Sequence, residues 1–193
     1  LTIQEGLTAA KRIYDLIDQA NQVVQDDTLK NLRILKGEIK FGNVNFIYPD
    51  GTEALKNLSL NIDGKTSAAL VGLSGGGKST ILNLIPRFYN LTDGEILIDG
   101  QNINEVQLNS LRKNISLVSQ DIVLFDDTVK ANIGYGNIMV TDEKIIEAAK
   151  KAAAHDFISN LSEGYETVIG EAGVKLSGGQ KQRLSIARAI LKN

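Results

Sequence analysis

A chain of 193 residues with 42% apolar and 23% charged residues has the size and composition of one globular domain with a sizeable core. Its formal net charge of −2 gives no electrostatic reason to expect nucleic acid as a partner. The absence of cysteine from the sequence excludes disulfides and thiolate metal sites, and no apolar run approaches the length of a membrane span.

The N-terminal segment has the pattern of an amphipathic helix. Over residues 2–22, Leu7, Ala10, Tyr14 and Ile17 fall on one helical face. Residues 26–36 are polar and unpatterned, which is typical of a linker. The helix is therefore either an appendage of something upstream or an ordinary packed helix, and the pattern leaves both open.

From residue 38 the apolar period changes to two, which predicts strands. Val44, Phe46 and Tyr48 alternate with polar residues before a Pro-Asp-Gly turn, and residues 58–62 alternate likewise. Residues 95–98 form another short strand, which an Asp-Gly dipeptide closes as a hairpin turn would. These segments predict an antiparallel β layer.

Residues 72–80, Gly-Leu-Ser-Gly-Gly-Gly-Lys-Ser-Thr, match the phosphate-binding pattern G-x-x-x-x-G-K-[ST]. Small apolar residues at 66–71 predict a buried parallel strand before it, and residues 81–85 carry apolar side chains at helical spacing after it. The pattern therefore lies between a predicted strand and a predicted helix, as a phosphate-binding loop does. The alternative is a glycine-rich turn that precedes Lys-Ser by chance.

The residue types of this loop suit a triphosphate. Glycines let the backbone bring several N–H groups onto one concave surface, and the positive end of the following helix adds to them. Lys78 is expected to bridge the outer phosphates, and the Ser79 hydroxyl to hold Mg²⁺. The predicted phosphate-binding residues are Gly72, Ser74, Gly75, Gly76, Gly77, Lys78, Ser79 and Thr80.

Further along, residues 115–119 are a strand candidate that runs into Gln120. Residues 142–153 predict a helix that opens with acidic residues and has Ile145, Ile146, Ala149, Ala152 and Ala153 on its apolar side. His155, the single histidine, has no nucleophile or ligand partner in the local sequence, so we expect it to be structural or to lie at the surface.

A second helix start also has features of an anion site. The run Leu-Ser-Gly-Gly-Gln at 176–180 precedes a helical pattern at 181–191. Ser177 is a good N-cap, and Gly178 and Gly179 leave the helix start open to a close-approaching ligand. A capped helix that happens to start with glycines is the alternative.

Together, the phosphate-binding loop, Gln120 after a strand and LSGGQ before a helix resemble the ATP-binding cassette (ABC) transporter family, from residue 38 to the C-terminus. The resemblance implies an α/β fold: a P-loop NTPase core (a parallel sheet with helices), an antiparallel β layer and a helical signature subdomain. Residues 118–133 are similar to the exporter branch, and residues 9–18 to the tail that follows an exporter's last membrane helix. The implied domains are a linker helix at 1–36 and a nucleotide-binding domain at 37–193.

The resemblance also assigns roles, with ATP and Mg²⁺ as cofactors. Tyr48 corresponds to the residue that stacks on adenine, for which the alternative is an ordinary strand tyrosine. Gln120 corresponds to the residue that touches Mg²⁺ or the attacking water. Ser177, Gly178, Gly179 and Gln180 would bind the γ-phosphate of ATP held by a second copy, in a head-to-tail dimer. Ala172 stands where exporters often carry arginine, which puts an inter-domain role of its loop in doubt.

In the family, the next strand carries an aspartate for Mg²⁺ and a glutamate that activates water, and a histidine follows. These motifs are absent from the 193 residues, so we expect a C-terminally incomplete cassette that binds ATP without hydrolysing it. The resemblance places the intact protein at the cytoplasmic face of the inner membrane, with its own transmembrane domain upstream.

The most similar exporters carry lipid A or drugs, although peptide and protein secretion systems share the motifs. A soluble ABC protein of translation or DNA repair, and an unrelated P-loop kinase or ATPase, are the alternatives.

Overall fold

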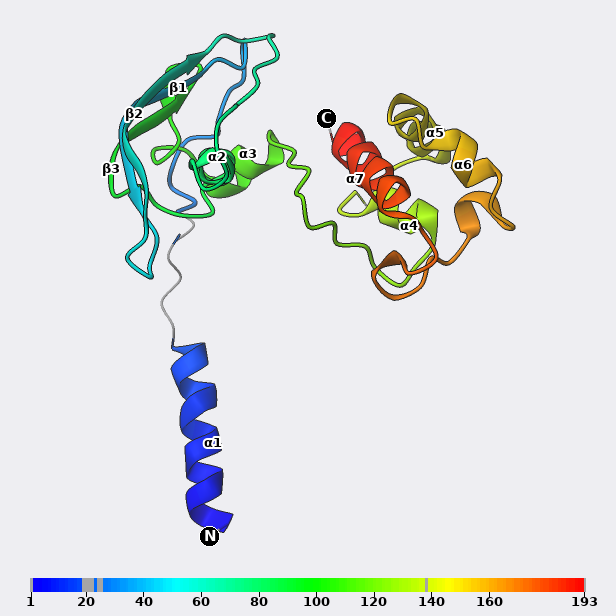
Figure 1. Ribbon diagram of the computed structural model, residues 1–193, viewed down its shortest axis with the longest axis horizontal. Helices are drawn as coiled ribbons and strands as arrows, with labels where there is room; N and C mark the ends of the chain where they lie inside the picture. Colours follow the sequence, from blue (N-terminus) through cyan, green and yellow to red (C-terminus); the bar gives the residue numbers. More distant parts are fainter. Residues whose placement is uncertain (1, 19–22, 24–25, 138, 193) are drawn as a thin grey trace. The chain divides into compact units, whose positions relative to one another are not determined.

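The computed structural model describes residues 2–18, 23, 26–137 and 139–192 (Figure 1). The chain divides into two compact units, residues 1–112 and residues 113–193, and each is described by itself. In the described part of the chain, no helix combines the length and the apolar composition that crossing a membrane requires.

The predicted N-terminal helix is confirmed as α1, which spans Thr2–Ile17. Residues 19–22 of the predicted range lie outside the described residues. Its apolar side chains are exposed: Leu7 is 65% exposed, Tyr14 64% and Ile17 67%. The amphipathic pattern therefore describes a real helical face that no described part of the chain buries.

The predicted antiparallel strands are confirmed in a sheet of order β2-β1-β3-β4. The strands are β1 (Ile39–Ile47), β2 (Glu53–Ile62), β3 (Asp93–Ile98) and β4 (Gln101–Asn102). An irregularity in β1 shifts its register against β2 between Phe41 and Val44, with Asn43 at a φ of 47°. This bulge explains why Phe41 and Val44 are both buried although they lie an odd number of positions apart, with two residues between them.

Two short helices complete the core of the first unit: α2 (Lys78–Leu84) and α3 (Leu108–Lys113) lie on the same side of the sheet (Figure 1). Burial of apolar side chains from strands, helices and connecting segments supplies the main stabilising term of this unit. The buried apolar residues are Leu32, Phe41, Val44, Phe46, Leu55, Ile81, Leu84, Ile96, Ile98, Ile103, Val106, Leu108 and Leu111.

The predicted linker at 26–36 is fastened to this unit. Leu32 is buried, and its N–H donates to Ser110 Oγ at 2.9 Å. The Asp99 carboxylate accepts the N–H groups of residues 35–38 at 2.6–3.0 Å. The segment is irregular, as predicted, but it is anchored to the turn between β3 and β4.

The parallel strand predicted at 66–71 and the strand candidate at 115–119 are not formed, which corrects that part of the expected fold. Val71 is 89% exposed, although its segment was predicted to be buried. A strand exists through hydrogen bonds to neighbouring strands, and no described strand pairs with either segment. The antiparallel layer and the helices of the mixed α/β fold are present as expected.

The second unit is helical. It consists of α4 (Val129–Gly134), α5 (Asp142–Lys151), α6 (His155–Ser159) and α7 (Gly178–Lys192), with single 3₁₀ turns η1 (Gly164–Glu166) and η2 (Glu171–Gly173). Figure 1 shows α7 beside α4 and α5. The core residues are Leu124, Val129, Ile133, Ile145, Ala149, Ala152, Ala154, Ile158, Ile169, Leu176, Leu184 and Ala187.

The helix predicted at 142–153 is thus confirmed, with two corrections to its apolar face. Ile146 is only half-buried, and Ala153 is exposed. Ala153 has a φ of 52°, so it lies in the left-handed region that ends the helix rather than on the helix itself.

Candidate nucleotide-binding site

The loop at 72–77 has the backbone geometry that its glycines allow. Gly75 and Gly77 have φ values of 80° and 76°, in the left-handed region where other residues are strained. Gly77 is also tightly enclosed, because a Cβ on it would lie 2.7 Å from Leu55 Cδ2 and 2.8 Å from the Ala54 carbonyl oxygen. The loop therefore approaches β2 at a point that only glycine fits.

Helix α2 begins directly after this glycine. Gly77 is the N-cap and makes no side-chain hydrogen bond, so no side chain caps the first amides of the helix. Ser79 is exposed in the first turn, where its hydroxyl is accessible. Open amides at a helix N-terminus favour an anion, and an accessible hydroxyl beside them suits a hard cation bound to that anion.

Lys78 folds back over the loop. Its Nζ donates to the carbonyl oxygens of Gly72 and Leu73, at 2.9 Å and 2.6 Å. The side chain is half-buried and makes no ion pair among the described residues, so its positive charge is held at the loop by neutral carbonyls. An anion in the loop would offer this ammonium a stronger, charge-assisted partner.

Tyr48 directly follows β1 and reaches the start of α2. Its hydroxyl is 2.9 Å from Thr80 Oγ1, and Thr80 is buried. The ring meets Phe46 edge to face at 4.8 Å and Tyr89 at 5.3 Å. The structure therefore joins the predicted adenine-stacking residue to helix α2, and no sequence pattern predicted Thr80 as its partner.

The predicted signature residues form a reciprocal cap at the start of α7. The N–H of Ser177 donates to Gln180 Oε1 at 2.8 Å, and the N–H of Gln180 donates to Ser177 Oγ at 3.4 Å. This is a capping box, with glutamine in its third helical position. The sequence predicted the Ser177 cap but not the returning bond from Gln180.

The two glycines of this helix start have no structural reason to be glycine. Neither Gly178 nor Gly179 has positive φ, and a Cβ on either would meet nothing within 4 Å. Glycine weakens a helix by about 1 kcal/mol relative to alanine. Residues that the fold itself disfavours indicate close approach of something outside this unit.

Gln120 belongs to the second unit, in the irregular segment between α3 and α4, and it is exposed. The segment is fastened three residues later, where Arg188 Nη1 of α7 donates to the Val123 carbonyl oxygen at 3.0 Å. Burial lowers the pKa of Arg188 from its ordinary value, with Tyr135 acting in the opposite direction. Sequence reasoning missed Arg188, because it appeared only as one polar position of a helical pattern.

A cavity of about 580 Å³ lies within the second unit beside this arginine. Ser116, Val123, Tyr135, Arg188 and Lys192 are among the residues that line it. None of the predicted nucleotide-binding residues lines it, so its size does not identify the nucleotide site. His155 is structural as expected, with Nδ1 2.9 Å from the Tyr165 hydroxyl.

A glycine loop that places a lysine at an uncapped helix start, beside an aromatic ring, defines a P-loop nucleotide-binding protein. Residues 55–193 match the family model described as ABC transporter, and the chain belongs to that family.

The comparisons give a flippase and a putative multidrug export protein among the relatives of this chain. The chain is 52% identical over 192 residues to the ATP-dependent lipid A-core flippase of Syntrophus aciditrophicus, covering 100% of this chain and 32% of that protein. It is 52% identical over 182 residues to a putative multidrug export ATP-binding/permease protein of Staphylococcus aureus, covering 94% of this chain and 32% of that protein. The chain thus spans about a third of the length of these relatives.

The fold comparison agrees. The structure of a bacterial Atm1-family ABC exporter with ATP bound matches with a TM-score of 0.92 and 44% identity, over 100% of this chain and 34% of that one. The ABC cassette fold, in which α-helices accompany an antiparallel sheet, is therefore the fold of this chain.

Proposed function

We propose that this chain is the ATP-binding domain of an ABC exporter, which powers export of a substrate across the inner membrane. The observation that carries the proposal is the pairing of two helix starts in one chain. One follows the phosphate-binding loop and holds Lys78. The other has Gly178 and Gly179, whose absence of side chains the fold does not require. A soluble ABC protein is not favoured, because the similar proteins are exporters.

The residues of the loop fit ATP with Mg²⁺. A nucleotide triphosphate would take the amides of the 72–77 loop and the Lys78 ammonium as donors, with the Ser79 hydroxyl as one Mg²⁺ ligand. The backbone supports this fit, since the positive φ of Gly75 and Gly77 shapes the loop without side chains over it. Tyr48 would stack on the base, held in place by Thr80.

The second helix start needs a second copy of the chain. Ser177, Gly178, Gly179 and Gln180 would meet the γ-phosphate of ATP held by the partner, so that each copy completes the other's site in a two-fold dimer. Gln120 would touch Mg²⁺ or the attacking water. Membrane association follows from the exporter relatives, and we place the cassette at the cytoplasmic face, below a transmembrane domain of the same protein.

Within this proposal, residues 1–36 join the cassette to the membrane domain and residues 37–193 form the nucleotide-binding domain. The intact protein is an ATPase, and the similar flippase is named as ATP-dependent. The 193 residues assayed by themselves should bind ATP without hydrolysing it, because the water-activating group and half of the Mg²⁺ shell are expected from other residues. A lipid or a drug is the proposed substrate, in line with the names of the relatives.

Turnover by the purified full-length protein tests the proposal. We expect Ser177→Arg to abolish ATP hydrolysis while leaving the affinity of the monomer for ATP nearly unchanged, because the residue acts on the partner's nucleotide. Gln182→Arg is the matched control, since it adds the same charge to an exposed position of α7. Undiminished turnover by Ser177→Arg, or equal loss in both variants, would remove the signature role.

A further inference from the structure

Arg188 of α7 forms a hydrogen bond with the backbone of the segment that follows Gln120. Its Nε donates to the Asn132 carbonyl oxygen at 2.8 Å, and its Nη1 donates to the Val123 carbonyl oxygen at 3.0 Å. Its Nη2 lies 3.3 Å from Asn132 Oδ1. One guanidinium thus contacts two separate stretches of chain, with each of its three nitrogens engaged.

Asn132 forms the other half of this attachment. It is 1% exposed, and its Oδ1 accepts the N–H of Phe125 at 2.9 Å. Its Nδ2 donates to the carbonyl oxygens of Phe125 and Thr128, both at 3.0 Å. A fully buried and fully paired amide of this kind rigidly fixes the backbone that it binds. Arg188 therefore holds the backbone at Val123, and Asn132 holds it at Phe125.

Two aromatic rings cover the guanidinium. Phe125 and Tyr135 are stacked at 4.4 Å, and Arg188 Cζ lies 5.9 Å and 5.5 Å from their centroids. In the described part of the chain, Arg188 makes no ion pair with a carboxylate. Its charge is therefore satisfied by carbonyl oxygens and ring faces, which suit the planar fork of arginine and not the point charge of lysine.

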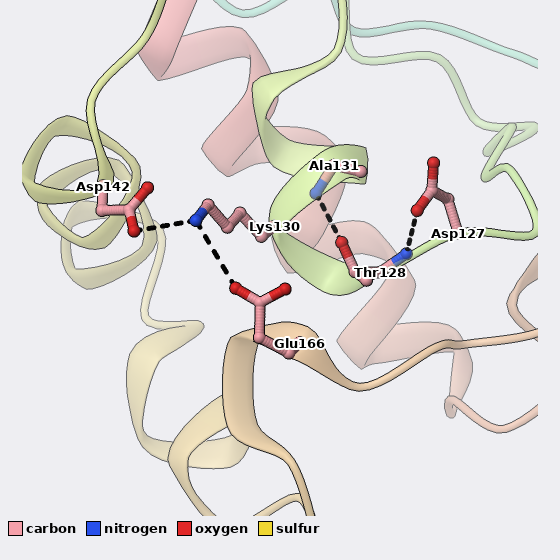
Figure 2. Close-up of polar contacts among 6 residues, drawn as sticks. All are labelled: Asp127, Thr128, Lys130, Ala131, Asp142 and Glu166. Carbon is pink, nitrogen blue, oxygen red and sulfur yellow. Dashed lines mark hydrogen bonds and ion pairs between the residues drawn. The ribbon is translucent and has the colours of Figure 1, made fainter.

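The helix that carries Asn132 is itself fixed within the unit (Figure 2). Thr128 Oγ1 caps α4 by accepting the Ala131 N–H at 3.0 Å. Lys130 Nζ lies 2.8 Å from an Asp142 carboxylate oxygen and 3.5 Å from one of Glu166, which joins α4 to α5 and η1. These contacts attach α4 to α5 and η1, so the helix that carries Asn132 has a fixed position within the unit.

We propose that Arg188 is a positioning residue that fixes the segment following Gln120 to the signature helix, so that Gln120 and residues 177–180 move together. Arg188 lies on the same rigid helix as Gly178, about 15 Å along its axis. The residue whose carbonyl oxygen it binds, Val123, lies three positions after Gln120. A displacement at either end is transmitted through Arg188 and Asn132, while the other contact of α7 with the irregular segment, Lys192 Nζ to the Ile115 carbonyl oxygen at 2.6 Å, lies before Gln120.

The inference rests on the proposed ATPase function, and it is tested in the full-length protein with two readouts. We expect Arg188→Met to lower kcat for ATP hydrolysis by about tenfold, with KM for ATP unchanged, because the residue acts on transition-state geometry and not on nucleotide binding. Amide hydrogen exchange should accelerate locally at 121–126, where the Phe125 N–H is held. Arg188→Lys should give a smaller decrease in kcat, since it keeps the charge but loses the fork.

Arg183 supplies the matched control on the same helix. Its Nη1 donates to the Ala153 carbonyl oxygen at 3.2 Å, and its Cζ lies 5.1 Å from the Phe157 ring centroid. Arg183→Met therefore removes a comparable set of contacts that does not reach residues 121–126. It should leave kcat at the wild-type value and accelerate exchange near residue 153.

Equal kcat in Arg188→Met and Arg183→Met, or accelerated exchange throughout the unit without an excess at 121–126, would overturn the inference. If Arg188→Met does not fold, Arg188→Lys decides, and wild-type kcat in that variant overturns it. Lys78→Ala separates this inference from the proposed function. If the wild type hydrolyses ATP no faster than Lys78→Ala, the proposed ATPase function is refuted. The hydrogen-exchange measurement requires no turnover, so it tests by itself whether Arg188 attaches residues 121–126 to α7.

Discussion

The Tyr48 hydroxyl lies 2.9 Å from Thr80 Oγ1, so the end of β1 is joined to the first turn of α2 by a side-chain hydrogen bond. Stacking on a base requires the ring and not the hydroxyl, and on that ground phenylalanine should replace Tyr48 at little cost in binding. The hydrogen bond adds a second role, which is to hold the ring beside helix α2.

These two roles predict different effects for different replacements. Tyr48→Ala should weaken ATP binding by about 1–3 kcal/mol, because the stacking face is lost. Tyr48→Phe should lower the free energy of unfolding by about 1 kcal/mol and should weaken binding much less than alanine does. Thr80→Val removes the same hydrogen bond by deleting the other partner, so it should lower the free energy of unfolding by about as much as Tyr48→Phe. If Tyr48→Phe weakened binding as much as Tyr48→Ala, stacking would be the wrong explanation.

Gly77 and Gly75 provide a matched pair for the geometry of the loop. Both have positive φ, so alanine at either position is strained by about 1–2 kcal/mol. At Gly75 the new methyl group meets nothing within 4 Å, whereas at Gly77 it meets Leu55 Cδ2 at 2.7 Å and backbone at 2.8 Å. Chemical denaturation should therefore show a clearly larger loss of stability for Gly77→Ala. Equal losses would mean that β2 does not constrain the loop.

At Gly179 we expect a substitution that keeps or raises the stability of the protein but lowers its activity. Gly179→Ala should leave the free energy of unfolding unchanged or raise it by up to about 1 kcal/mol, because alanine favours helix and its methyl group meets no neighbour. Turnover by the assembled protein should fall, since the methyl group occupies the surface proposed to meet the partner's phosphate. Thermal unfolding and ATPase measurements on the same variant check both parts. Full activity would show that the glycine serves no ligand.

Asp99 predicts a specific acid dependence. The N–H groups of Gly37, Leu35, Glu38 and Lys36 hold the pKa of Asp99 well below its ordinary value and outweigh the opposing effect of burial. A carboxyl group with a depressed pKa in the folded state contributes stability above its unfolded pKa of about 4, and this contribution is lost as pH falls through the folded pKa.

Asp99→Asn should therefore be less stable than the wild type by on the order of 2 kcal/mol at pH 7, because charge-assisted bonds are lost. The difference should narrow progressively below about pH 4. Urea unfolding of both proteins across this range is the measurement. A difference that stayed constant down to about pH 2 would mean that the carboxylate charge is not what holds residues 35–38.

The fold was predictable where local pattern and local structure coincide. Alternation predicted the strands around Val44 and Leu58, and the Asp-Gly turn signal marked the end of the short strand at 95–98. The helical patterns of α5 and α7 predicted those helices. The strands expected at 66–71 and 115–119 were not formed, because small apolar residues indicate only that burial is favourable. Whether a strand forms there depends on a neighbour to pair with, which a local pattern cannot report.

The candidate site shows the same division. Lys78 and Ser177 were found from motifs, since their spacing to the glycines is local in sequence. Thr80 as the partner of Tyr48, and Arg188 as the partner of Val123, required the structure. Those contacts join residues 32 and 65 positions apart, and no periodicity connects them.

Nucleotide binding by the loop is the central claim, and Lys78 is the residue on which it depends most directly. Isothermal titration of Mg-ATP into the wild type, Lys78→Ala and Lys40→Ala is the most direct measurement, with Lys40 as an exposed lysine of β1 outside the loop. We predict that the wild type and Lys40→Ala bind alike and that Lys78→Ala binds far more weakly or not at all, because the charge-assisted contact to the outer phosphates is lost. Equal binding by all three proteins would contradict the assignment of residues 72–80 as the nucleotide site.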